Sequence, residues 1–278
     1  MEISSMGESP EALPTKVYSK LIKDEFEELL LNHGANEKAF QRFFERNPCY
    51  LPGSRGEFDP IGQSGHGPHL KALITQPELN GLVRRNPDFL WFAWDSVVLS
   101  PILIEIEAPD KNYFTKTNKP TSDFTQARHQ LSEWRAILSM PENKLKFLSQ
   151  FNLPASLRNL VFDPYYVLIY GRRSEYENDP WRTQQRYTMV SRADHEILMS
   201  YDRLKPFIID TNLICCEVKG GKYFAKHLSP TFDLDYFDLD VKKLENLEIA
   251  IDVMQHTSPQ RKLLLKKKLM KTSRSKKA

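Results

Sequence analysis

The sequence predicts an α/β domain in which helices flank a mixed central sheet. Two observations lead to this prediction. Short apolar runs typical of buried strands alternate with stretches of helical spacing, in the order helix, hairpin, helix, strand, helix, strand. The chain has 278 residues, 40% hydrophobic and 27% charged, which is enough to bury one substantial core.

The first helices are expected near the N-terminus, after a flexible leader over residues 1–15. Apolar residues at helical spacing predict a helix over residues 17–31, ended near Gly34. Asn36 is a favourable N-cap residue, so a second helix is expected from there to Asn47. The glycine- and proline-rich residues 52–69 are expected to form a loop.

The most informative stretch is residues 87–107, PDFLWFAWDSVVLSPILIEIE. Two apolar runs flank a polar break at residues 95–96, which predicts a β-hairpin. Because side chains two apart on a strand share a face, Glu105 and Glu107 are expected to project together, opposite the neighbouring isoleucines. With Asp88 on the preceding strand, three carboxylates would converge. Such crowding is costly unless protons or a cation neutralise it, so the stretch indicates a divalent-metal phosphodiesterase centre, meaning a nuclease.

Each of these carboxylates also has a simpler interpretation. Asp88 after a proline is typical of a strand start or a turn. Glu105 and Glu107 would equally suit the solvated face of an edge strand. The strongly apolar character of the rest of the run, and the position of Asp88 one hairpin away, favour the metal site.

Downstream, residues 122–139 predict an amphipathic helix with Ser122 as its cap and an apolar stripe on its buried face. Gln126 and Gln130 lie one turn apart on this helix and are expected to share a face. The apolar stripe consists of Phe124, Ala127, Leu131, Trp134 and Leu138. The remaining expected elements are a polar connector, a buried strand at 165–170, a helix around 179–192, strands at 196–199 and 213–218, a helix at 240–255 and a basic helix from Ser258.

The charge is uneven along the chain. Residues 261–278 carry nine basic and no acidic groups, so the other 260 residues have 30 basic against 36 acidic groups, a net of −6. Such a tail is either a solvated end or a contact for a phosphate backbone. No apolar run is long enough to span a bilayer, and no secretory signal opens the chain. Three cysteines give no disulfide framework, so a cytoplasmic protein is expected. His66 and His69 have no zinc-ligand partners at suitable spacing and are interpreted as loop residues.

Six ordered segments together resemble a known family. They are EKAFQRFFERNPCYL at 37–51, PDFLWF at 87–92, ILIEIEAPDKNYFTK at 102–116, FTQARHQLSEW at 124–134, VLIYGRR at 167–173 and EILMSYDRL at 196–204. Over roughly residues 30–210 the chain resembles the catalytic domain of the Shedu anti-phage defence nucleases, the SduA C-terminal domain, within the PD-(D/E)XK nuclease superfamily. The resemblance implies a restriction-endonuclease-like sheet, DNA rather than RNA as substrate, a homo-oligomer and a role in phage defence.

The resemblance also implies roles for particular residues. Asp88, Glu105 and the backbone carbonyl of Ile106 would hold Mg²⁺ or Mn²⁺. Glu107 stands where the superfamily usually has lysine, and would act as a general base or bind a second metal. Gln130 would orient the attacking water or contact phosphate. Glu37 is the candidate for an additional metal or active-site residue, and phosphate contacts are expected from Lys111, Lys116, Arg172 and Arg173.

The expected organisation is a leader and helix over residues 1–30, a nuclease domain over 31–210, an extension over 211–258 and a basic tail over 259–278. Two rival functions remain open from the sequence. One is a catalytically inactive nucleic-acid-binding module on the same fold. The other is an interaction protein whose basic tail docks a partner or an anionic surface.

Overall fold

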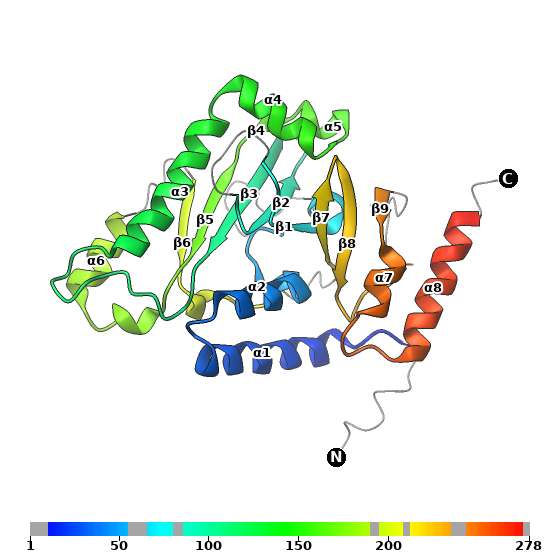
Figure 1. Ribbon diagram of the computed structural model, residues 1–278, viewed down its shortest axis with the longest axis horizontal. Coiled ribbons are helices and arrows are strands. Elements are labelled where there is room, and N and C mark those ends of the chain that lie inside the picture. The colour runs from blue at the N-terminus through cyan, green and yellow to red at the C-terminus, as the bar shows by residue number, and fades with distance from the viewer. Residues whose placement is uncertain are drawn as a thin grey trace, which may run out of the picture.

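The computed structural model describes residues 11–54, 66–79, 86–189, 195–207, 212–234 and 243–274. Within these residues nine strands form one mixed sheet, ordered β6-β5-β3-β2-β1-β7-β8-β9, with β4 paired to β3 (Figure 1). The strands are β1 Ala72–Thr75, β2 Phe89–Trp94, β3 Val98–Ile106, β4 Val161–Phe162, β5 Tyr165–Ile169, β6 Glu196–Met199, β7 Ile214–Lys219, β8 Lys222–Leu228 and β9 Leu244–Glu245. The predicted mixed α/β class is therefore confirmed.

Helices pack on both faces of this sheet and bury two hydrophobic clusters, one on each face. Short 3₁₀ turns at Pro48–Tyr50, His69–Lys71, Arg173–Glu175 and Tyr201–Arg203 join some of the elements. The helices are α1 Thr15–Asn32, α2 Glu37–Arg46, α3 Ser122–Leu138, α4 Pro141–Gln150, α5 Ala155–Arg158, α6 Pro180–Thr188, α7 Leu247–Asp252 and α8 Pro259–Arg274. In the part of the chain that the structure describes, none of them is both long and apolar enough to cross a membrane.

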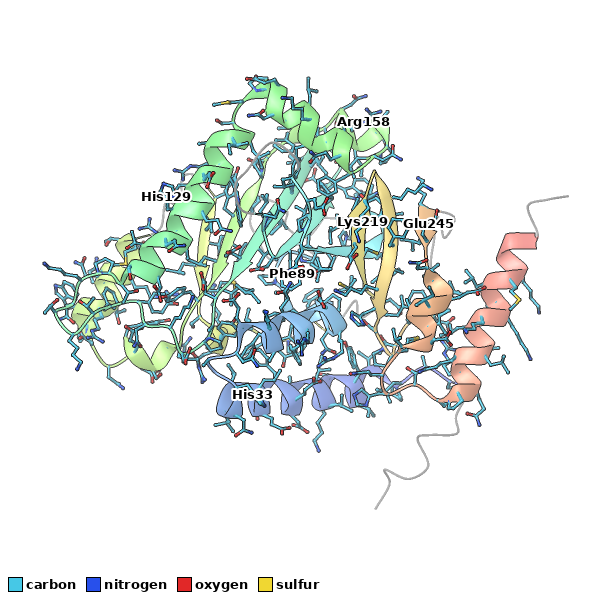
Figure 2. The ribbon with its side chains drawn as sticks, in the orientation of Figure 1. His33, Phe89, His129, Arg158, Lys219 and Glu245 are labelled. Carbon is cyan, nitrogen blue, oxygen red and sulfur yellow. The ribbon has the colours of Figure 1, made fainter. Side chains whose placement is uncertain are left out.

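The predicted hairpin is present as β2 and β3, which pair antiparallel from Phe89 opposite Ile104 to Trp94 opposite Leu99. The carboxylate of Asp95 accepts hydrogen bonds from the backbone N–H groups of Val97 and Val98, each at 2.7 Å. This local bonding ends β2 and begins β3, as the polar break predicted. Figure 2 shows Phe89 in the interior of the molecule, above α2.

The two faces of β3 pack against different helices. Ile102, Ile104 and Ile106 belong to the cluster that also contains the buried residues of α1 and α2. Leu103 belongs to the other cluster, which contains the buried residues of α3 and α4. Because side chains alternate along a strand, Glu105 lies on the same face as Leu103 and points toward α3. The predicted separation of Glu105 from the isoleucines is therefore confirmed.

Helix α3 buries the stripe that the sequence predicts. All five of its apolar residues are at most 4% exposed. Gln130 is also buried, at 4%, whereas Gln126, one turn earlier, is exposed, so only Gln130 of the two reaches the core. An offset of four residues turns a helix by about 40°, which is enough to move one side chain from the stripe to its solvent edge. His129 lies on the outer face of the helix (Figure 2).

The cap of α3 is Thr121 and not Ser122. The Thr121 hydroxyl accepts the Phe124 N–H at 3.2 Å and donates to the Asn112 carbonyl at 2.7 Å. It therefore joins the helix to the loop that leaves β3. The hydroxyl of Ser122 contacts Asp123 instead.

We expect Thr121→Ala to lower the free energy of unfolding by about 1–2 kcal/mol, because it removes both the helix cap and the bond to the loop. Urea denaturation with a fitted midpoint and slope measures the change. Ser122→Ala is the matched control, since it deletes a neighbouring hydroxyl that caps nothing, and it should cost only a few tenths of a kcal/mol. Equal losses in the two variants would contradict the assignment of the cap.

Several sequence expectations need correction. The stretch between α3 and β5 contains α4, α5 and β4, where only a polar connector was expected. Strands β1 and β8 were not predicted, although β1 joins the two halves of the sheet by pairing with both β2 and β7. The helix expected over 240–255 is α7 alone, preceded by β9. Positions 55–65 of the expected loop, 190–192 of the expected helix and 240–242 lie outside the described residues.

The basic tail forms α8 as far as Arg274, and its first part packs on the chain. Arg261 is 3% exposed, and its guanidinium donates to the Phe232 carbonyl at 2.9 Å and contacts Asp233 at 3.0 Å. Lys266 pairs with Asp252 at 2.6 Å. Part of the tail's positive charge is therefore neutralised within the chain.

Candidate functional site

Asp88 lies directly before β2 and is tied to the end of β3. Its carboxylate Oδ2 accepts the Ile106 N–H at 2.9 Å, and its own carbonyl accepts the Gln76 N–H at 2.7 Å. The hairpin register that places Phe89 opposite Ile104 brings Asp88 next to Glu105. The backbone pairing of the hairpin therefore positions the first two carboxylates of the site.

Glu105 is the penultimate residue of β3 and faces α3, where Gln130 is buried. Its Oε2 atom is buried and accepts no hydrogen bond from the described residues. A buried, unsatisfied carboxylate oxygen costs free energy, so it requires a compensating proton or cation. This orphaned oxygen is the clearest structural sign of a ligand site.

The carboxyl groups of this region raise one another's pKa values. Loss of solvent raises the pKa of Asp88 to about 7, with the Ile106 N–H opposing the shift and Glu37 and Glu107 adding to it. Loss of solvent, then the charge of Asp88, raises the pKa of Glu105 well above its usual range, while the nearby Gln130 amide lowers it. The carboxyl groups of Glu37, Asp88, Glu105 and Glu107 therefore lie close enough for their charges to interact.

Glu37 and Glu107 complete this acidic cluster, which we define as Glu37, Asp88, Glu105 and Glu107. Glu37 is in the first turn of α2, and burial followed by the charge of Glu107 raises its pKa. The Glu107 carboxylate forms an ion pair with the Lys111 ammonium. A cation from the loop after β3 thus already lies against one of the four acids.

The cluster does not form a complete set of metal ligands by side chains alone. Within the described ranges, no group of three or more His, Cys, Asp or Glu side chains is arranged to hold a metal ion. Mg²⁺, however, is commonly held by one or two carboxylates together with waters. The pair Asp88 and Glu105, with the carbonyl of Ile106, suits that chemistry, and a cation would satisfy the orphaned Glu105 oxygen.

The basic residues predicted to contact phosphate divide into two kinds. Lys111 and Arg172 are engaged in ion pairs, Lys111 with Glu107 and Arg172 with Asp202 at 2.8 Å. The side chains of Lys116 and Arg173 are exposed. The structure thus leaves the second pair available at the surface and binds the first pair to acids.

Comparison with known proteins bears on the whole of this region. The family model described as Shedu protein SduA, C-terminal, matches residues 34–204. The chain belongs to the Shedu family. That membership implies a role in anti-phage defence, and the match spans every predicted site residue from Glu37 to Arg173. A search of the curated proteins finds no match.

One residue of this Shedu chain that contacts the site was missed in the sequence. Tyr201 is fully buried, and its hydroxyl donates to the Glu107 carbonyl at 2.8 Å across 94 residues of sequence. Its backbone N–H donates to the Gly171 carbonyl at 3.1 Å. Tyr201 therefore holds the end of β3 beside the end of β5. The available signal was an aromatic residue two positions after a predicted strand, which is too common to single out.

Proposed function

We propose that this Shedu chain is a metal-dependent endonuclease that hydrolyses DNA phosphodiester bonds on a restriction-endonuclease-like core. The observation that carries the proposal is the half-buried pair Asp88 and Glu105. Glu105 has an oxygen with no hydrogen-bond partner in the described residues, and both carboxyl groups have raised pKa values. A pair of this kind is costly without a cation, and its oxygen ligands suit Mg²⁺ or Mn²⁺.

In this proposal Asp88, Glu105 and the Ile106 carbonyl hold the cation. A divalent cation at this position would supply Lewis acidity toward the scissile phosphate and would help to activate the attacking water. Gln130 is buried in the packed stripe of α3, and its side-chain N–H group would donate a hydrogen bond to the water or the phosphate. Glu107 accepts the proton that the attacking water loses.

Glu107 occupies the position where the superfamily usually has lysine, yet a lysine still reaches the site. The Lys111 ammonium forms an ion pair with the Glu107 carboxylate. We propose that Lys111 supplies the positive charge that stabilises the developing oxyanion, while Glu37 helps to hold the cation or its waters. The exposed Lys116 and Arg173, and Arg172 beside Asp202, would contact the DNA backbone.

The choice of DNA over RNA and a homo-oligomeric state rest on the family resemblance, and the proposed cytoplasmic location rests on the cysteine content. A second candidate function is a catalytically inactive nucleic-acid-binding module. The specific observation in its favour is that the described side chains form no three-ligand metal group, in a chain that lacks the usual motif lysine. Metal-dependent cleavage distinguishes the two.

The test is cleavage of linear and supercoiled DNA by the full chain with Mg²⁺, Mn²⁺ or EDTA. We expect cutting that EDTA stops, and a rate at least about 100-fold lower in Asp88→Asn, because loss of a direct ligand should cost no less than loss of an outer-sphere partner. Asparagine keeps an oxygen that can accept the Ile106 N–H. Asp110→Asn, at an exposed aspartate nearby, is the matched control and should cut like the wild type.

Cutting that persists in Asp88→Asn would show that the activity lies elsewhere. Metal-independent binding of DNA without cutting by any form would favour the inactive module. Neither binding nor cutting would favour the interaction protein.

A further inference from the structure

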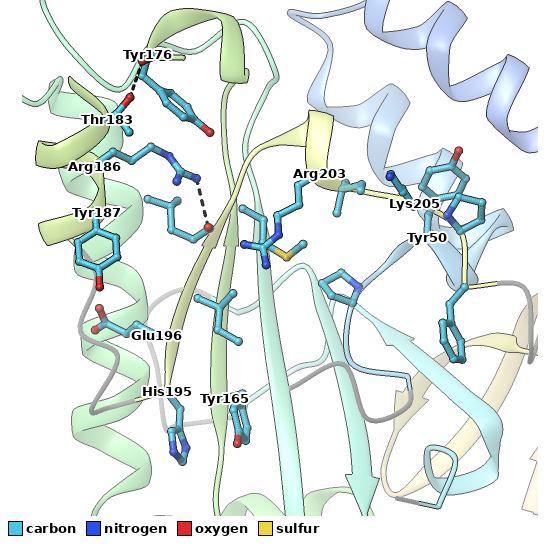
Figure 3. A pocket seen from close by; sticks show the side chains of 17 residues that line it. Tyr50, Tyr165, Tyr176, Thr183, Arg186, Tyr187, His195, Glu196, Arg203 and Lys205 are labelled. Atoms are coloured by element: carbon cyan, nitrogen blue, oxygen red, sulfur yellow. Dashed lines mark hydrogen bonds between the residues drawn. The ribbon is translucent and has the colours of Figure 1, made fainter. Parts of the chain in front are cut away.

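A groove of about 780 Å³ runs along β6, at the end of the sheet order (Figure 3). Side chains of α6 line one side of β6, and the segment after Tyr201 lines the other. Its volume falls in the range of ordinary ligand sites. The lining residues that matter for its chemistry are Tyr165, Tyr187, His195, Glu196, Arg203 and Lys205.

The groove carries positive charge that none of the described residues neutralises. Arg203 and Lys205 are exposed, and neither forms an ion pair or side-chain hydrogen bond with any described residue. The acid of the groove, Glu196, is 7% exposed and is already bound to the Arg135 guanidinium at 2.5 Å. An occupant that complements this surface carries negative charge.

The groove is also lined by aromatic rings. His195 stacks on Tyr165 with ring centroids 4.4 Å apart and an angle of 9° between the planes. His195 Nδ1 lies 3.2 Å from Asp163 Oδ1, and the backbone φ of His195 is 55°, a strained value for a side-chain-bearing residue. Tyr187, on α6, is 56% exposed. Exposed or rigidly held rings and cations along the same groove are the elements of a base-stacking surface.

One outward carbonyl on the edge of β6 is already occupied. In a parallel ladder the even-numbered carbonyls of β6 point away from β5, and the Arg186 guanidinium donates to the outward carbonyl of Leu198 at 3.3 Å (Figure 3). A peptide or a second copy adding a strand here would lose that partner. This bond therefore favours an occupant recognised through side chains over an added strand.

One end of β6 is connected to the acidic cluster through the buried side chain of Tyr201. Tyr201, whose hydroxyl contacts the Glu107 carbonyl, begins the 3₁₀ turn that ends at Arg203. Met199, at the same end of β6, accepts the N–H of Tyr170 at the end of β5. From Met199 the groove extends back to His195, about 13 Å along a strand of ordinary rise.

We propose that this groove binds a single-stranded stretch of nucleic acid. The inference rests on the proposed nuclease function and adds a substrate form to it. Arg203 and Lys205 contact phosphates, while Tyr187 and the ring of His195 stack on bases. Stacking of this kind requires unpaired bases, so a frayed end or a single strand fits and an intact duplex does not.

The test is fluorescence anisotropy with the full chain, a labelled oligothymidylate and a duplex of equal length, in EDTA so that no cleavage occurs. We expect Arg203→Ala/Lys205→Ala to lower the slope of log affinity against log salt by about 1.4, since each phosphate contact to a single strand contributes about 0.7. We expect Tyr187→Ala to weaken binding roughly 5- to 100-fold, and Tyr187→Phe to bind like the wild type because the ring remains.

The charge-matched control is Lys20→Ala/Lys23→Ala, which removes two exposed lysines of α1 and should leave the slope within a few tenths of the wild-type value. Wild-type affinity and slope in both groove variants, or losses of affinity confined to the duplex, would overturn the proposal. So would a concentration-dependent dimer that the groove variants abolish, since a second copy would then be the occupant. If the wild type binds through the groove but cuts nothing with Mg²⁺ or Mn²⁺, the nuclease function fails and the groove assignment stands. If the wild type cuts DNA in a metal-dependent way but the groove variants bind like the wild type, the groove assignment fails and the nuclease function stands.

Discussion

Glu105→Gln is expected to lower the rate of metal-dependent DNA cleavage by at least about 100-fold, because it removes a direct ligand of the proposed cation. Glutamine has the same shape and keeps one oxygen, so the strand and its packing should be preserved. The measurement is the cleavage rate at several Mn²⁺ concentrations, which separates weaker metal binding from a slower chemical step. Glu142→Gln, at an exposed position in α4, is the control and should leave the rate unchanged.

The same substitution should stabilise the metal-free protein. Burial and the charge of Asp88 raise the pKa of Glu105, so the folded state holds a proton that the unfolded chain releases. The free energy of unfolding must then fall as pH rises above the ordinary glutamate pKa, because the unfolded chain loses this proton at a lower pH than the folded protein does. We expect the Tm of Glu105→Gln to exceed that of the wild type at about pH 8 and to match it near pH 4, in EDTA.

With divalent metal present, the wild type should instead have the higher Tm of the two proteins. A cation at 100 times its Kd stabilises a folded protein by about 2.7 kcal/mol, so Mn²⁺ should raise the Tm of the wild type and leave that of Glu105→Gln nearly unchanged. Thermal scans with and without Mn²⁺ measure the difference. A variant that is less stable than the wild type at every pH, and still cuts DNA, would show that Glu105 only fills the core.

Gly171→Ala is expected to cost at least about 3 kcal/mol of unfolding free energy, the largest loss of stability that we predict for one methyl group. Gly171 follows β5 with φ at +60°, which disfavours any side chain. An added Cβ would lie 2.8 Å from the Lys111 carbonyl oxygen and 2.8 Å from Tyr113 Cε2. Neither can retreat easily, because the Tyr113 hydroxyl donates to the Tyr170 carbonyl and the ring is fully buried.

Gly220→Ala is a matched control for this position. Gly220 has nearly the same backbone, with φ at +58°, but nothing lies within 4 Å of an added Cβ. Its substitution should cost only the conformational penalty of about 1–2 kcal/mol. Urea denaturation of both variants separates strain from close contact, and equal losses would show that the contacts around Gly171 relax without cost.

Gly171→Ala should also disturb the site. The Gly171 carbonyl accepts the N–H of Tyr201, whose hydroxyl holds the Glu107 carbonyl, and Lys111 contacts Glu107 directly. The packing of Gly171 thus connects the end of β5 to the acidic cluster. For this reason the DNA-cleavage rate of the surviving folded protein is expected to fall as well.

The features that sequence reasoning found correctly are local ones. The hairpin of β2 and β3 is set by alternation of apolar residues and by Asp95, which bonds the backbone two and three residues ahead. The stripe of α3 follows from helical spacing alone. The missed elements β1 and α4 are a four-residue strand and a helix of mixed polar character, whose patterns in the sequence are weak.

The sequence by itself determined the mixed α/β class, the hairpin that sets Asp88 beside Glu105, and the family, because these follow from short-range periodicity and from ordered motifs. Only the tertiary structure decided that Gln130 is buried while Gln126 is exposed, that Arg172 is paired with Asp202, and that Tyr201 contacts Glu107. The groove along β6 likewise exists only once α6 and the segment after Tyr201 pack on either side of the strand. These contacts join residues far apart in the chain, and no local pattern specifies which distant partner a side chain will meet.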